Sequence, residues 1–237
     1  PSTFPNTKAP SFLPVRKYSY ITGTGWLVGG GYVVTNHHVI EGQVEIKVRF
    51  NSYDLDTLYQ AKVVLSDSHN DLALLKLEGA ESVAARAIPL SLTAPTLGQD
   101  VFTVGYPKSD IMGLKPKVTN GIVSALSGYR DDPRVIQTTV ALQSGNSGGP
   151  LFNMKGEVVG VTSSSLLGFV SKDEGKGLDI PQNVNYAIKS AYVQALLSTL
   201  PNKGNYPEIQ PKRLKLEDII PRVIDSVLQV IVKVPES

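Results

Sequence analysis

Most of the chain alternates between apolar and polar residues with a period of two, which is typical of half-buried β-strands. The alternation is clearest in residues 43–50, where Val44, Ile46, Val48 and Phe50 are apolar. Segments with similar strand character are 23–28, 32–35, 61–65, 72–77, 100–105, 118–126, 135–142, 156–161 and 228–234. Glycines and polar clusters separate these segments, as in antiparallel sheets with short turns. The pattern therefore predicts an all-β protein.

Helical periodicity is confined to the C-terminal third of the chain. Apolar residues in 186–200 recur with a spacing that predicts an amphipathic helix, and Pro201 would end it. Residues 202–215 are polar and basic and are expected to form a connector. The segment 216–227 resembles a short helix interrupted by a proline, and a strand is expected after it. Residues 1–14 contain four prolines and are expected to form an irregular arm.

Composition narrows the function classes. With 237 residues, 41% of them hydrophobic and 19% charged, the chain can form one large or two small β domains with a real core. A net charge of +2 does not favour nucleic-acid or membrane binding through bulk electrostatics. The lack of cysteine excludes disulfides, thiolate metal sites and a cysteine nucleophile. No apolar run approaches the roughly 20 residues that a membrane-spanning helix needs.

The segment 145–150, Gly-Asn-Ser-Gly-Gly-Pro, is the strongest candidate for chemistry. Glycines allow a turn in which a serine side chain stands free while several backbone N–H groups point to one place. That geometry suits a nucleophile, Ser147, beside an oxyanion hole. The alternative is a tight hairpin in which the serine only caps a turn.

Two further segments supply the partners that a nucleophilic serine requires. His37 and His38 directly follow a predicted strand, and Asp71 directly precedes the apolar strand 72–77, with Asp67 as the rival acid. Each of these residues alone could be an ordinary turn residue. Together they provide, in chain order, a base, an acid and an alcohol, which are the three groups of a Ser-His-Asp triad.

Residues 35–40 (Thr-Asn-His-His-Val-Ile), 71–76 (Asp-Leu-Ala-Leu-Leu-Lys) and 145–151 resemble the three active-site segments of the trypsin-like serine proteases. The resemblance is to the HtrA/Deg (Do-like) branch, includes the segment 183–188, and covers roughly residues 20–200. It implies that His38, next to the valine, is the base, with His37 as a neighbour. It also implies that Asp71 orients the base and that Ser147 is the nucleophile. The oxyanion donors would be the N–H groups of Gly145 and Ser147, with Asn146 as a further contributor.

The resemblance also implies a fold and a substrate site. The fold would be two six-stranded antiparallel Greek-key β-barrels, chymotrypsin-like, with the active site between them. The candidate linker 91–98 would separate an N-terminal barrel with its arm (1–94) from a C-terminal barrel with its closing helix (95–201), followed by the tail (202–237). Ala141 and Leu142 would begin the wall of the specificity pocket, and the strand Val161, Thr162 and Ser163 would pair with substrate. No acidic residue stands where a basic P1 side chain would bind, so small or medium apolar residues are expected there.

The chain departs from the HtrA/Deg pattern in two respects. The 37 residues after Leu200 are too few for the PDZ domain that usually follows in that branch. The short helix and strand that normally open the protease domain are hard to find before Gly23, but a similar pattern occurs at 218–232. We therefore hypothesise that residues 216–234 supply this element from the C-terminus, docked on their own barrel or on a neighbour's. The alternative is that the tail begins a further domain.

The leading functional expectation is a serine endopeptidase acting on exposed or unfolded polypeptides, without metal or organic cofactor. The alternatives are a chaperone-like or peptide-binding module on a protease fold that stays inactive until activated, and a structural β-barrel adaptor. By analogy with the branch, an extracytoplasmic location, periplasmic or secreted, is expected. A homo-oligomer could form through the N-terminal arm or the C-terminal tail. The glycine-bearing segment 166–182 is either a specificity or gating loop or a disordered excursion.

Overall fold

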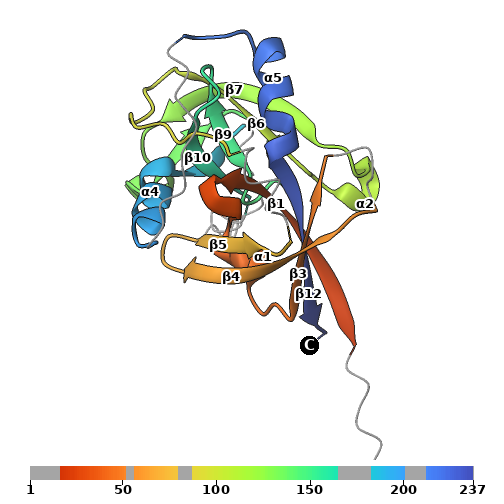
Figure 1. The fold of residues 1–237 in the computed structure, drawn as a ribbon. Coiled ribbons are helices and arrows are strands. Elements are labelled where there is room, and N and C mark those ends of the chain that lie inside the picture. Colours follow the sequence, from red (N-terminus) through yellow and green to blue (C-terminus); the bar gives the residue numbers. More distant parts are fainter. Residues whose placement is uncertain (1–16, 52–55, 80–86, 165–182, 201–211, 237) are drawn as a thin grey trace, which may run out of the picture.

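The computed structural model describes residues 17–51, 56–79, 87–164, 183–200 and 212–236. These residues form two closed antiparallel barrels of six strands each (Figure 1). The predicted fold class is therefore confirmed. The predicted N-terminal arm at 1–14 and the predicted loop at 166–182 lie outside the described residues.

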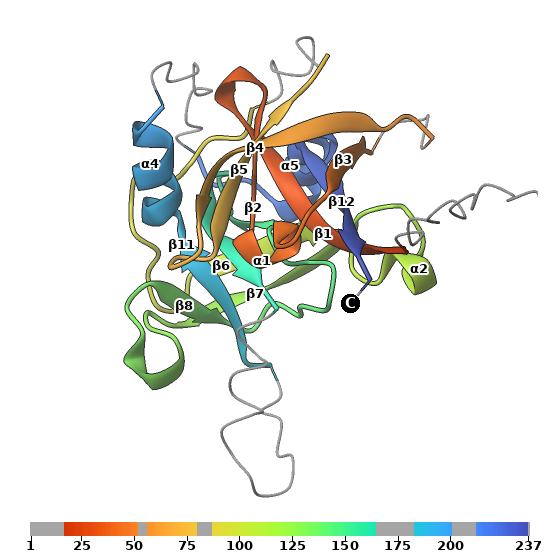
Figure 2. The same cartoon turned by 90° about the horizontal axis from the view of Figure 1, so that it is seen from below.

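The first barrel is built mainly from the N-terminal part of the chain. It consists of β1 (Tyr18–Val28), β2 (Tyr32–Thr35), β3 (Glu45–Phe50), β4 (Tyr59–Asp67), β5 (Leu72–Leu77) and β12 (Val227–Pro235), in the order β1-β12-β3-β4-β5-β2. Inward-facing residues of β3 are buried at every second position, as the alternation predicts. The short elements η1 (Gly29–Gly31) and α1 (His37–Ile40) precede and follow β2. Figure 2 shows α1 near the centre of the molecule, where it contacts β1, β5 and β12.

The C-terminal segment completes this first barrel. β12 pairs with β1 from Tyr18↔Pro235 to Trp26↔Val227 and with β3 from Leu228↔Phe50 to Lys233↔Glu45. The strand thus lies between two strands of its own chain, as one form of the sequence hypothesis expects. Val230 and Val232 on its inner face are fully buried. Closing the barrel in this way pairs edges of β1 and β3 that would otherwise be open.

Two short helical elements lead into β12 and touch the second barrel. They are α5 (Leu216–Val223), which contains Pro221, and η4 (Ile224–Ser226). Ile219 and Val223 of α5 are buried, and a β-carbon added to Gly156 would lie 3.3 Å from Ile219 Cγ2. The tail therefore contacts both barrels.

The second barrel has the same strand number and a similar connectivity. It consists of β6 (Asp100–Gly105), β7 (Lys117–Ala125), β8 (Val135–Thr138), β9 (Pro150–Asn153), β10 (Val158–Ser163) and β11 (Asn185–Lys189), in the order β10-β11-β8-β7-β6-β9. Short helical segments α2 (Ser109–Met112) and η3 (Tyr129–Asp131) lie in its connections. The helix predicted near 186–200 is wrong at its start, because only α4 (Ser190–Ser198) is helical. The preceding residues form β11, which pairs with both β8 and β10 and closes the barrel.

A continuous apolar core joins the barrels. It includes Trp26 and Leu74 from the first barrel and Phe102, Phe152 and Val161 from the second. The Phe102 and Phe152 rings stack with centroids 4.8 Å apart. The predicted linker at 91–98 lies between β5 and β6 in the chain, and its first residue, Ser91, donates its N–H to the Val158 carbonyl. The shared core holds the facing sides of the barrels in a fixed relation, which an active site between them requires.

Candidate active site

His38 and Asp71 form the first half of the candidate site. α1 begins one residue after the end of β2. His38 on this helix therefore lies beside Asp71, the residue before β5. Asp71 accepts three hydrogen bonds from His38: its Oδ1 accepts the backbone N–H at 2.9 Å, and its Oδ1 and Oδ2 lie 3.0 and 2.8 Å from the ring Nδ1. A carboxylate can only accept, so Nδ1 carries the proton and Nε2 of the neutral ring is left as a proton acceptor.

Asp71 is held in place from its main chain as well. It has φ of +53°, a left-handed conformation that non-glycine residues seldom adopt. The Asn36 side-chain amide donates to the Asp71 carbonyl oxygen at 2.8 Å. The residue before α1 therefore fixes the turn that presents the acid to His38.

The structure separates the two rival residues from this pair. His37 Nδ1 lies 2.6 Å from the Ser66 hydroxyl. The Asp67 carboxylate accepts the backbone N–H and the side-chain amide of Asn70 at 3.0 and 2.7 Å. His38 and Asp71, and not their rivals, are thus brought together.

The second half of the site is the turn containing Ser147, and its peptide groups alternate in their hydrogen bonding. The Gly145 carbonyl accepts the Thr24 hydroxyl at 2.7 Å, and the N–H of the same peptide, from Asn146, donates to Gln143 O at 2.9 Å. The Ser147 carbonyl accepts the Thr24 N–H at 2.8 Å, and the N–H of that peptide, from Gly148, donates to Thr162 O at 2.9 Å. Both groups of these two peptides are therefore used.

The peptides 144–145 and 146–147, each of which directly precedes one of these two, use only their carbonyls. The Ser144 carbonyl accepts the Lys108 N–H at 2.9 Å. The Asn146 carbonyl accepts the Thr162 hydroxyl at 2.7 Å and the Gly149 N–H at 3.0 Å. Within the described part of the chain, the N–H groups on the opposite side of these peptides, those of Gly145 and Ser147, donate no hydrogen bond. A planar trans peptide points its N–H away from its C=O, so fixing the carbonyl also fixes the direction of the free donor.

Two glycines are required by the close packing of this turn. Gly145 has φ of +98°, and a β-carbon there would lie 2.5 Å from Tyr106 O. Gly148 has φ of +85°, and its β-carbon would lie 2.2 Å from Thr35 Oγ1 and 2.9 Å from Asn36 N. The turn thus lies directly against the end of β2, from which His38 follows.

Ser163 and Ser164 link the two halves. Ser163 Oγ donates to Asp71 Oδ2 at 3.3 Å. Ser164 donates its N–H to Ser147 Oγ at 3.1 Å, and the two hydroxyl oxygens lie 2.6 Å apart. Sequence reasoning did not single out Ser164, because a serine outside the glycine-rich segment carries no motif.

Several other predicted site residues already use their main-chain groups in hydrogen bonds within the protein. The Asn146 N–H is used within the turn, so it is not available as an oxyanion donor. Val161 pairs with β9 and β11, and Thr162 donates its N–H to Gly149 O while its carbonyl accepts from Gly148. A substrate strand therefore has no free main-chain group at Val161 or Thr162 on this side. The next main-chain donor that faces the turn, the Ser164 N–H, donates to Ser147 Oγ. Ala141 is exposed beside buried Leu142.

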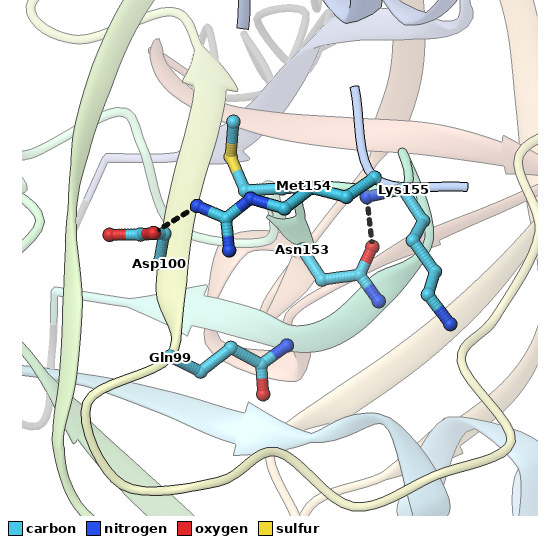
Figure 3. Close-up of a pocket in the computed structure, with 6 residues that line it drawn as sticks. Gln99, Asp100, Asn153, Met154 and Lys155 are labelled. Carbon is cyan, nitrogen blue, oxygen red and sulfur yellow. Dashed lines mark hydrogen bonds and ion pairs between the residues drawn. The ribbon is translucent and has the colours of Figure 1, made fainter. Parts of the chain in front are cut away.

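A small open pocket lies elsewhere, between β6, the turn after β9 and the chain before α5. Its lining residues are Gln99, Asp100, Asn153, Met154, Lys155 and Arg213 (Figure 3). Arg213 pairs with Asp100, and the Leu214 N–H donates to Met154 O at 2.8 Å. None of the predicted site residues lines this pocket, which marks where the C-terminal segment crosses the second barrel.

No group of three His, Asp or Glu side chains among the described residues could bind a metal ion. None of the described helices has the length and apolar character needed to cross a bilayer.

Comparison with known proteins gives the family context for this geometry. Residues 23–161 match the trypsin-like peptidase domain, a range that includes His38, Asp71 and Ser147. A probable periplasmic serine endoprotease, DegP-like, from Pseudomonas savastanoi pv. phaseolicola is 39% identical over 176 residues, which cover 71% of this chain and 35% of that protein. The uncharacterised protein y4bJ from Sinorhizobium fredii is 38% identical over 199 residues, 83% of this chain and 30% of that protein. The chain thus spans about a third of the length of these relatives.

The solved structures give the same result. The crystal structure of the serine endoprotease from Yersinia pestis superimposes with a TM-score of 0.56 at 28% sequence identity. The match covers 74% of this chain and 56% of that one. Sequence and structure therefore lead to the same group of proteins.

Proposed function

Because this chain belongs to the trypsin-like peptidase family, we propose that it is a serine endopeptidase of the HtrA/DegP type that uses Ser147, His38 and Asp71 as its triad. The observation that carries the proposal is the contact of His38 Nδ1 with the Asp71 carboxylate at 2.8 Å. This contact fixes the tautomer in which Nε2 can accept a proton. Ser147 would supply that proton. Its hydroxyl is linked to the end of β10 through Ser164, and the neighbouring Ser163 donates to Asp71.

The reaction would follow the acyl-transfer route of serine proteases. Ser147 Oγ attacks the scissile carbonyl carbon while its proton passes to His38 Nε2, and Asp71 stabilises the imidazolium that forms. His38 then gives this proton to the leaving amine as the C–N bond breaks. Water, activated by His38 in turn, hydrolyses the acyl-enzyme and restores the serine hydroxyl.

The free N–H groups of Gly145 and Ser147 are our candidates for the oxyanion hole. Preorganised donors of this kind are the largest single contribution in many acyl-transfer enzymes. The hydrogen bonds of Ser164 are compatible with the mechanism. The Ser164 N–H donates to Ser147 Oγ, and either hydroxyl can be the donor between the two oxygens. When Ser164 is that donor, the Ser147 hydrogen is left for His38.

We propose that the substrate is a polypeptide segment in extended form, bound as an added strand along the end of β10 at Ser163 and Ser164. Ala141 and Leu142 carry no charge, so small or medium apolar P1 residues are expected. A peptide library digested with the native protein checks this preference. Cleavage mainly after Lys or Arg would show that the pocket is assigned to the wrong residues. Introducing a carboxylate by Ala141→Asp should shift cleavage toward basic P1 residues.

Location and assembly are proposed by analogy with the relatives. Several relatives are named periplasmic, and by analogy we propose an extracytoplasmic location. Fractionation of cells that express the full natural protein tests it, and exclusive recovery with cytoplasmic markers would refute it. Assembly into a homo-oligomer through the arm or the tail stays a prediction, which light scattering of the purified protein can check.

A fluorophosphonate probe tests the central proposal. Attack by Ser147 Oγ on phosphorus with loss of fluoride would leave a covalent adduct, which peptide mass mapping can locate. The wild-type protein should be labelled at Ser147, and Ser147→Ala should not be labelled. A folded wild-type protein that neither reacts nor cleaves an unfolded polypeptide would favour the peptide-binding alternative over the endopeptidase.

A further inference from the structure

Thr24 of β1 connects the first barrel to the nucleophile turn of the second. Its side chain is fully buried, with 0% exposure. Its hydroxyl donates to Gly145 O at 2.7 Å and accepts the Tyr106 N–H at 3.0 Å. Its N–H donates to Ser147 O at 2.8 Å, and its carbonyl accepts the Thr35 hydroxyl at 2.8 Å. All of its hydrogen-bonding groups are thus directed to residues of the site or of its supports.

The residues on either side of Thr24 allow this close approach. A β-carbon on Gly23 would lie 2.6 Å from Val39 Cγ1 and 3.2 Å from Ser147 O. One on Gly25 would lie 2.7 Å from Val33 Cγ1. Real side chains do not reach such distances. Glycine at 23 therefore permits the approach of β1 to the turn, and glycine at 25 permits its packing inside the first barrel.

Thr24 acts on the two peptide groups that alternate with the candidate oxyanion donors. It holds the carbonyls of Gly145 and Ser147, whereas the free N–H groups belong to the preceding peptide of each residue. The Ser147 N–H belongs to the peptide between the two that Thr24 holds, and the Gly145 N–H to the peptide just before the first of them. Hydrogen bonds from Thr24 therefore restrict the torsions on both sides of the Ser147 donor and on one side of the Gly145 donor. Holding both carbonyls from a single residue therefore limits both free donors together.

We propose that Thr24 is a positioning residue, which orients the Gly145 and Ser147 N–H groups toward the substrate oxyanion through the carbonyls that it holds. It contacts neither substrate nor the reacting atoms. The inference rests on the proposed endopeptidase function and adds a first-barrel residue to it. It predicts a loss of transition-state stabilisation, and not of substrate binding, when the Thr24 hydroxyl is removed.

The test compares Thr24→Val, which keeps the shape and removes the hydroxyl, with Thr24→Ser, which keeps the hydroxyl. Thr138→Val is the matched control. Thr138 is also 0% exposed, and its hydroxyl likewise donates to one carbonyl, of Ile122, and accepts one N–H, of Val140. Each protein is assayed for kcat, KM, inhibition by a peptide boronate that forms a tetrahedral adduct, and melting temperature.

Removal of a whole oxyanion donor costs about 10²–10³ in kcat, and a misdirected donor should cost less. We expect Thr24→Val to lower kcat by about 10- to 100-fold, with KM within about threefold and boronate affinity reduced in parallel. Thr24→Ser should stay within about threefold of wild type, and Thr138→Val should lose similar thermal stability while keeping kcat within about threefold. If Thr24→Val does not fold, Thr24→Ala against Thr24→Ser makes the same comparison.

The outcomes separate the two claims. If the wild-type protein is inert toward both substrate and fluorophosphonate, the proposed function fails and this inference fails with it. If the wild type is active and Thr24→Val, or Thr24→Ala in its place, loses no more kcat than Thr138→Val, only the inference is overturned. A rise in KM with unchanged kcat, in which boronate and substrate affinity fall by the same factor, also overturns it.

Discussion

At the residue scale, two adjacent histidines meet different partners. His38 contacts the Asp71 carboxylate, whereas His37 contacts the Ser66 hydroxyl. The roles we propose therefore predict a large loss of kcat for alanine at position 38 and almost none for alanine at position 37. Following the losses known for subtilisin, His38→Ala or Ser147→Ala should lower kcat by roughly 10⁶, and Asp71→Ala by roughly 10⁴.

His37→Ala is the control for that series. Its imidazole is absent from the proposed proton path, so kcat should stay within about threefold of wild type. Steady-state hydrolysis of an unfolded protein substrate, with active sites titrated, measures all four variants. Near-native turnover by His38→Ala, or a loss of several orders of magnitude in His37→Ala, would reverse the assignment of the base.

Gly148 supports a second prediction at this scale, because two separable effects forbid a side chain there. Its φ of +85° alone costs an alanine about 1–2 kcal/mol, and the overlap with Thr35 Oγ1 at 2.2 Å adds about 1–3 kcal/mol. Gly148→Ala should therefore lower the free energy of unfolding by about 2–5 kcal/mol. Gly42 has φ of +69° with no atom within 4 Å, so Gly42→Ala should cost only about 1–2 kcal/mol. Urea denaturation of both variants measures the difference, and equal losses would show that the overlap is relieved by small shifts.

Sequence reasoning could find some of these residues and not others. Ser147, His38 and Asp71 stand out because a functional group beside glycines or at a strand end is visible in the chain itself. Thr24 and Ser164 look like ordinary strand residues, and their contacts arise only when β1 and the end of β10 meet the turn. Which main-chain N–H groups stay free depends on donors from three separate segments, those of Thr24, Lys108 and Thr162, which hold the carbonyls of the turn. The Asn146 N–H is used because Gln143 O accepts it.

At the element scale, β12 is the strand on which the first barrel depends. It pairs with β1 along nine residues of each strand, from Tyr18 to Trp26, and with β3 on its other side. The alternation of 228–234 predicted a strand, but its partners lie more than 170 residues away in the chain, and no local pattern specifies them. By contrast, β11 was missed as a strand. Four of its five residues are buried, so its two faces do not alternate in polarity.

Substitutions on the two faces of β12 test its contribution. Val230 is fully buried in the first barrel, and the next residue, Ile231, is only partly buried. Val230→Asp would place an unpaired carboxylate in the core and should destabilise the protein by more than about 3 kcal/mol, enough to unfold many domains. Ile231→Asp should cost less than about 1.5 kcal/mol. Circular dichroism during thermal unfolding compares them, and equally mild effects would mean that β12 is not an integral strand.

Deleting residues 212–237 should abolish cooperative unfolding.

At the scale of the whole molecule, the site exists only where the two barrels are held together. The shared apolar core supplies most of the contact, and it is supplemented by polar links such as Thr24 to Gly145. A second polar link lies at the surface. Arg134 forms an ion pair with Asp132 at 2.7 Å beside β8, and its guanidinium also donates to His69 O in the turn between β4 and β5. Asp132 thus orients a side chain that reaches from the second barrel to the first.

This link gives stability a defined dependence on pH. Hydrogen bonds from the Arg134 side chain hold the pKa of Asp132 below its usual value. An acid whose pKa is depressed in the folded state stabilises the protein above its unfolded pKa of about 3.9, and this stabilisation is lost as the pH falls through the folded value. Because the pair is near the surface, Asp132→Asn should lower the melting temperature at pH 7 by at most about 3 °C. The difference from wild type should stay constant between about pH 5 and pH 8 and disappear as the pH falls below about 4.

Glu78→Gln controls for the change in net charge. It removes an exposed carboxylate whose ion pair with Lys62 joins two residues of the first barrel and does not link the barrels. A difference that persists at low pH would mean that the Asp132 carboxylate is not the group responsible, and that the asparagine disturbs the fold in some other way.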